Sequence, residues 1–162
     1  MKKMLMMFLV GIMVFASMGS AYAAETADNQ AKTAKVEMLR ALQDEIHQIN
    51  ELRMERLDVR KEIVEKHDTM LDLYIEAKEN GNKESLVAAK EVRAQLKDLN
   101  DELQAVHNQI KTARQSLKEA KKNGDTDHAE TLANEIISLG QEFDNKLSDK
   151  VNLLEEIINI LS

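Results

Sequence analysis

A run of ten apolar residues, spaced alternately three and four positions apart, constrains the fold of this chain more than any other feature. The run consists of Ala89, Val92, Leu96, Leu99, Leu103, Val106, Ile110, Ala113, Leu117 and Ala120. This spacing is the a and d pattern of a heptad repeat, and it is unbroken over more than four heptads. A strand would need alternation every second residue. The sequence therefore predicts a long helix that packs against other helices through one face.

The segments on either side carry the same period less regularly. Upstream it is marked by Leu39, Leu42, Ile46, Ile49, Leu52, Val59, Ile63, His67, Met70, Tyr74 and Ala77, and downstream by Ala129, Ala133, Ile136, Gly140, Phe143, Leu147, Val151, Leu154, Ile158 and Leu161. The chain has no proline, 31% charged residues and only 3% aromatic residues, a composition typical of long helices. We therefore predict three helices, at about 30–79, 83–122 and 126–161.

The gaps between these helices hold two similar loops, AKENGNKES and AKKNGDTDH. Gly81 and Gly124 stand where the residue after a helix needs a positive φ, which glycine adopts without a Cβ clash. Asn82 and Asp125 follow them as N-caps of the next helix. Connections this short make neighbouring helices antiparallel. The predicted fold is all-α: one antiparallel up-down-up three-helix bundle with heptad packing, over residues 35–162.

One layer of this predicted bundle contains a charge. Folding the helices back about the two glycines brings Arg56 to the level of Val106 and Phe143. A guanidinium at a core position is expected to reach for solvent along its apolar stem. We therefore expect Leu57 to turn inward and Arg56 to point outward.

The N-terminus has the pattern of a secretory signal peptide over residues 1–23. Lys2 and Lys3 precede the apolar run MLMMFLVGIMVFA, and Ala21-Tyr22-Ala23 supplies the small residues of a cleavage site. We expect export by the general secretion route, to the periplasm or the medium, with no membrane span after cleavage; an uncleaved anchor is the alternative. The polar segment 24–34 is predicted to be a flexible tail. Loss of the two lysines changes the formal net charge from −7 to −9, which disfavours nucleic acid as a partner.

Motifs for chemistry are missing from the sequence. The chain has no cysteine, which excludes disulfides and thiol catalysis. Its histidines, His47, His67, His107 and His128, include no pair three or four residues apart. No serine lies in a G-x-S-x-G context, and no phosphate-binding loop is present. We therefore predict no enzyme activity, no cofactor and no metal site.

The strongest functional signal is an apolar end of the bundle. VNLLEEIINIL, residues 151–161, has seven apolar residues in eleven, and the part of the first helix expected beside it is similarly apolar. Part of this surface is expected to be core. The remainder is predicted to be a partner-binding patch. Its residues are Leu73, Ile75, Leu153, Ile157 and Ile160.

These features predict a non-enzymatic helical bundle that binds a protein or peptide partner, with a chaperone-like role included. The alternative is a structural or self-associating coiled-coil element of the cell envelope. The predicted geometry resembles spectrin-type three-helix units. The exported, cysteine-free character resembles small periplasmic stress chaperones, whose Leu-Thr-x-x-Gln motif has no counterpart here because no Leu-Thr pair occurs.

Overall fold

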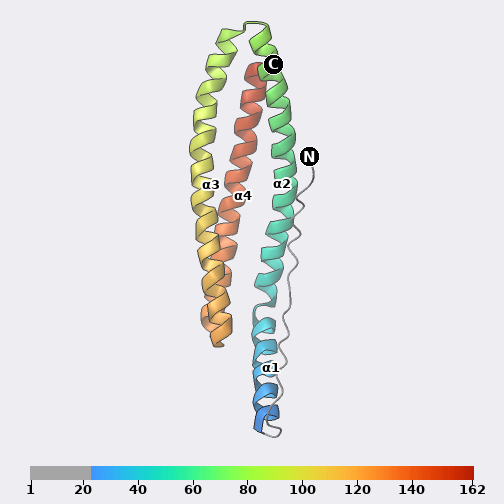
Figure 1. Ribbon diagram of the computed structural model, residues 1–162, viewed down its shortest axis with the longest axis vertical. Helices are drawn as coiled ribbons and strands as arrows, with labels where there is room; N and C mark the ends of the chain where they lie inside the picture. Colours follow the sequence, from blue (N-terminus) through green and yellow to red (C-terminus); the bar gives the residue numbers. More distant parts are fainter. Residues whose placement is uncertain (1–22) are drawn as a thin grey trace, which may run out of the picture. The chain divides into compact units, whose positions relative to one another are not determined.

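The computed structural model describes residues 23–162, and this part of the chain is all-helical (Figure 1). Its elements are α1 (Ala23–Ala41), α2 (Gln43–Glu79), α3 (Lys83–Asn123) and α4 (Thr126–Leu161). The predicted signal peptide, apart from Ala23, lies outside the described residues. The chain divides into two units, Met1–Thr33 and Ala34–Ser162. The contacts described below belong to the second unit.

The prediction of three helices is wrong at Leu42, where the first helix divides into α1 and α2. Leu42 has φ −97° and ψ 11°, outside the helical range, although its N–H still donates to Met38 O at 3.0 Å. The departure shifts the helical phase, so Met38 is buried and Leu39, predicted to lie in the core, is 54% exposed. Leu42 itself is completely buried. Segment 24–34, predicted to be a flexible tail, belongs to the α1 helix, and its mobility stays a prediction.

Both corners have the predicted glycine geometry. Gly81 has φ +70° and Gly124 has φ +76°. At the first corner, Asn82 N donates to Ala77 O at 2.9 Å and Gly81 N to Lys78 O at 3.2 Å, which satisfies the last carbonyls of α2. The following helices are capped as predicted, since Asn82 Oδ1 accepts from Ser85 N and Asp125 Oδ1 from His128 N. The repeated AKxNG segment therefore ends one helix and starts the next.

The heptad face predicted on the middle helix is the buried face of α3. Its residues are buried except Leu99 and Leu117, which are partly buried. A main cluster joins those from Ala89 to Ile110 to Ile63 of α2 and to Phe143, Leu147, Leu154, Ile157 and Leu161 of α4. A second cluster joins Met38 and Leu42 to Ala120, Ala129, Leu132 and Ala133. Burial of these side chains is the main favourable contribution to the stability of such a fold.

α4 lies beside both α2 and α3, whereas α2 and α3 touch each other at few places (Figure 1). Lys66 Nζ of α2 contacts Glu155 Oε1 at 2.7 Å, and Lys146 Nζ of α4 contacts Glu102 Oε2 at 2.6 Å. Ring contacts join α2 to α3 near the first corner, where the Arg93 guanidinium lies 4.4 Å from the Tyr74 ring centroid. Further from that corner, α2 and α3 line hollows whose lining also includes Ile136 and Phe143 of α4.

Candidate functional site: a basic groove between α2 and α3

The five residues of the predicted apolar patch do not form one exposed surface. Ile157 is completely buried in the main core, and Leu73, Leu153 and Ile160 are partly buried against it. Ile75 alone is substantially exposed, at 47%. The reason is the position of α4 between two helices: an element that packs on both sides needs a wide apolar face. The apolar character of 151–161 therefore serves packing.

A different site lies where α2 and α3 separate. One hollow of about 320 Å³ is lined by Arg53, Arg56, Leu57, Arg60, His107, Ile110, Arg114 and Phe143. A second, of about 150 Å³, is lined by Ile46, Ile49, Asn50, Arg53, Arg114, Leu117, Lys121 and Ile136. Arg53 and Arg114 line both, so the two hollows form one groove. At 1.5 Å per residue, the stretch of α2 along it is about 21 Å long.

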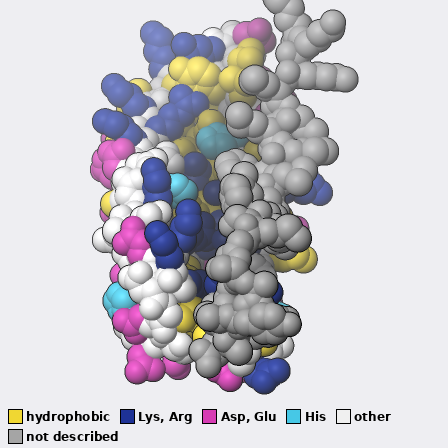
Figure 2. Space-filling view, turned by 60° about the horizontal axis from the view of Figure 1, so that its bottom comes forward, with side chains coloured by type: hydrophobic (Ala, Val, Ile, Leu, Met, Phe, Trp, Pro, Cys, Tyr) yellow, Lys and Arg dark blue, Asp and Glu magenta, His cyan; other side chains and the backbone are white. Residues whose placement is uncertain are grey.

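The groove has an apolar floor and a basic rim. Ile110, Ile136 and Phe143 in the floor are all buried. Cationic side chains border it on both sides: Arg53 and Arg60 from α2, Arg114 and Lys121 from α3. In the space-filling view, Lys and Arg side chains gather around a hollow in the face shown (Figure 2). Such a surface combines apolar contact with attraction for negative charge.

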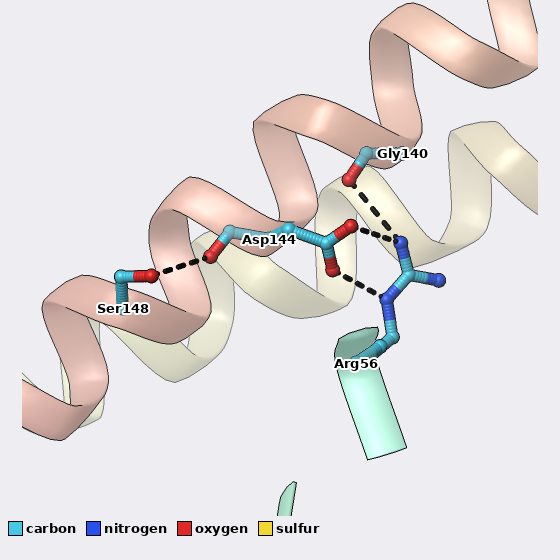
Figure 3. Close-up of polar contacts among 4 residues, drawn as sticks. All are labelled: Arg56, Gly140, Asp144 and Ser148. Carbon is cyan, nitrogen blue, oxygen red and sulfur yellow. Dashed lines mark hydrogen bonds and ion pairs between the residues drawn. The ribbon is translucent and has the colours of Figure 1, made fainter. Parts of the chain in front are cut away.

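Arg56 holds α2 against α4 at the groove, contrary to the expected outward position (Figure 3). Its Nε lies 2.6 Å from Asp144 Oδ1, and its Nη2 lies 3.0 Å from Asp144 Oδ2 and 3.2 Å from Gly140 O. The guanidinium also lies 4.7 Å from the Phe143 ring centroid. Its side chain is only 12% exposed, whereas Leu57, expected to turn inward, is 63% exposed. The expectation was wrong because α4 supplies the Asp144 carboxylate and the Gly140 carbonyl oxygen as acceptors at this level.

Gly140 provides the space for this contact. A Cβ atom at this position would lie 3.0 Å from Leu52 Cδ1 and 3.7 Å from Arg56 Nη2. The first distance is shorter than van der Waals contact. Glycine therefore lets α2 approach α4 closely enough for Arg56 to reach both Asp144 and the Gly140 carbonyl.

The other arginines of the groove have no carboxylate partner among the described residues. Arg53 donates only a long bond of 3.4 Å to Asn50 Oδ1, and Arg60 and Arg114 form no ion pair within residues 32–162. Partial burial lowers the pKa of Arg114, and the charges of Arg53 and Arg56 lower it further. This clustering of like charges is unfavourable in the free protein, and a bound anion would relieve it.

Sequence reasoning missed this groove although a signal was present. Arg53, Arg56 and Arg60 are spaced three and four residues apart, which places them on one side of a helix. The net charge of −7 directs attention to basic partners instead. The position of Arg114 opposite them depends on how α3 packs, which the spacing alone does not give.

Comparison of the chain with protein-family models, with curated proteins and with solved structures found no match. Among the described residues, no helix combines the length and apolarity needed to cross a bilayer.

Proposed function

We propose that this protein is an exported, non-enzymatic binding module, and that its groove holds an acidic amphipathic segment of a protein or peptide partner. The observation that carries the proposal is the groove itself: an apolar floor bordered by arginines that lack carboxylate partners among the described residues. An amphipathic helix docks in such a groove through its apolar stripe, and its flanking charges set specificity. A chaperone-like or adaptor role fits a site of this kind.

The arrangement of the helices around the groove is proposed together with the function. In solution, residues 34–79, α3 and α4 form an up-down-up bundle of three helical legs with heptad packing. The interhelical ion pairs support the directions, because Arg56 and Lys66 of α2 meet Asp144 and Glu155 of α4 in the same order. Such a bundle leaves one side open to a fourth helix. A ligand about 14 residues long would span the groove of about 21 Å at the helical rise.

Affinity for two matched peptides tests the function. The first peptide is an amphipathic helix with leucines on one face and glutamates beside them, and the second has glutamine in place of each glutamate. Titration calorimetry should show binding of the first and at least roughly tenfold weaker binding of the second, because only the first carries charges for the rim. The protein as a whole is acidic, so general attraction cannot produce this preference.

Matched variants locate the effect. Arg53→Gln/Arg60→Gln/Arg114→Gln should weaken binding of the acidic peptide by roughly tenfold or more. Lys90→Gln/Lys97→Gln/Lys118→Gln removes the same charge from exposed α3 positions outside the groove lining and should leave affinity almost unchanged. Equal effects of the two triple variants would reject the groove as the site.

Export is proposed with the function. The intact mass of protein recovered from the periplasm or medium should correspond to a chain that begins after Ala23. Recovery of the full-length chain from the cytoplasm would reject both cleavage and export. Peptide binding by the purified protein would be unaffected by that result, so the two parts of the proposal fail separately.

A further inference from the structure

A second surface, on the side of α2 away from the core, carries an apolar stripe. It consists of Met54, Leu57, Val64, Leu71 and Ile75, whose exposed fractions are 69%, 63%, 59%, 54% and 47%. Their spacing of three, seven, seven and four residues matches a and d positions of one heptad register. Lys61 and Asp68 occupy the two remaining positions. We call these seven residues the α2 stripe.

The stripe has edges of opposite charge. In the same register the e positions are Asp58, Glu65 and Asp72, all acidic. The g positions are Arg53, Arg60, His67 and Tyr74, of which the two arginines carry the positive charge. Residues at e and g border the contact of a two-stranded coiled coil and determine which partner and which orientation it accepts. An apolar seam with one acidic and one basic edge is self-complementary, because a parallel copy brings the basic edge of each helix to the acidic edge of the other.

We propose that the α2 stripe is the interface of a homodimer, in which the α2 helices of two copies pack as a parallel coiled coil. In this arrangement a g residue faces the e residue five positions later on the other chain. Arg53 then meets Asp58 of the second copy and Arg60 meets its Glu65, and the two-fold axis repeats each pair. Neither arginine has a carboxylate partner among the described residues of the single chain, and in the dimer each of them forms an ion pair.

An antiparallel dimer is disfavoured by the same edges. It would bring e to e and g to g, so acidic residues would face acidic ones and arginines would face arginines. It would gain one contact, between Lys61 and Asp68 of opposite chains. The parallel dimer instead places Lys61 against Lys61 and Asp68 against Asp68 of the other copy, because both are a positions. These two like-charge layers weaken association while Leu57, Val64 and Leu71 pack in the d layers. We therefore expect a reversible dimer.

The dimer does not rest on the proposed groove function, although Arg53, Leu57 and Arg60 border both surfaces. Variants that alter only one of the two surfaces distinguish the dimer from the groove function. Val64 and Leu71 belong to the stripe and not to the groove lining, and Arg114 belongs to the groove and not to the stripe. Val64→Glu/Leu71→Glu should abolish the dimer, and Arg114→Gln should leave it intact.

Sedimentation equilibrium over a concentration series gives the first test. The wild type should shift from monomer to dimer, and Val64→Glu/Leu71→Glu should remain monomeric with unchanged helicity. A wild type that stays monomeric at every concentration overturns the proposal. A double variant that dimerises like the wild type overturns it as well, because the interface must then lie elsewhere.

Cysteine crosslinking tests the orientation, because the natural chain has no cysteine. In a parallel dimer Leu57→Cys and Leu71→Cys should each crosslink to itself under mild oxidation. Ala94→Cys, at an exposed α3 position, is the control and should stay reduced. In an antiparallel dimer neither α2 variant would crosslink alone, but an equal mixture would. Crosslinking only in the mixture would overturn the parallel arrangement.

Discussion

The contact between Arg56 and Asp144 should contribute measurably to stability, and Asp144→Ala tests this. The variant leaves the guanidinium, 12% exposed, with the Gly140 carbonyl as its remaining hydrogen-bond acceptor among the described residues. Exposed ion pairs contribute about 0–1 kcal/mol, and breaking a fully buried one costs about 3–5 kcal/mol. The Arg56–Asp144 pair lies between these limits, since Asp144 is 19% exposed and accepts two charge-assisted bonds. We expect a loss of about 2 kcal/mol in the free energy of unfolding.

Thermal unfolding followed by circular dichroism measures this loss. For a unit of this size, about 2 kcal/mol corresponds to a decrease in Tm of roughly 5–10 °C. Asp149→Ala, at an exposed α4 position, is the control and should lower Tm by little. Arg56→Met/Asp144→Leu should recover most of the loss, because apolar replacement of both partners removes the unpaired charge. If Asp144→Ala unfolds at the same temperature as the wild type, the pair does not hold α2 to α4.

The other predictions concern burial, the second corner and pH. Ile157→Ala should lower the free energy of unfolding by about 2–5 kcal/mol because Ile157 is completely buried. Ile75→Ser, at an exposed position, should change it by less than about 0.5 kcal/mol. If denaturant titrations give similar losses for both variants, the assignment of Ile157 to the core is wrong. Gly124→Val should lower the free energy of unfolding by about 1 kcal/mol or more, because valine resists the φ of +76° at this corner. Steric clash does not contribute, since nothing lies within 4 Å of a Cβ atom there. An unchanged Tm would show that the backbone of the corner adopts another conformation at no cost. Burial and then the charge of Lys150 lower the pKa of His67 below 6.5. The imidazole of His67 therefore binds a proton more readily in the unfolded chain than in the folded one, and the stability of the fold should decrease as pH falls below about 6.5. The decrease should be smaller in His67→Gln, which lacks this group.

The sequence predicted those parts of the fold that depend on neighbouring residues. The α3 face was recognisable because heptad spacing repeats within one helix, and the corners because Gly81 and Gly124 take a backbone conformation that other residues resist. The caps at Asn82 and Asp125 are equally local. The break at Leu42 was not predictable in this way, since it allows Leu42 to reach a cluster built from α3 and α4.

The site depended on contacts between distant residues. Arg56 turns inward because the fold brings Asp144, which is 88 residues later in the sequence, beside it. No local sequence pattern predicts that partner. Leu153 and Ile160 of the predicted patch are only partly exposed for a related reason. An apolar face looks the same in sequence whether one helix or two cover it, and α4 packs against both α2 and α3. The groove likewise exists only because α2 and α3 separate.

The most direct test of the proposed function is to observe where an acidic amphipathic peptide binds. An environment-sensitive fluorophore on the Asn50→Cys variant would report from the groove, and the same label on the Glu135→Cys variant would report from an exposed α4 position outside the groove lining. Addition of the peptide should shift the emission of the label at position 50 to shorter wavelength and leave that of the label at position 135 unchanged. A shift at position 135 with none at position 50 would contradict the groove as the binding site.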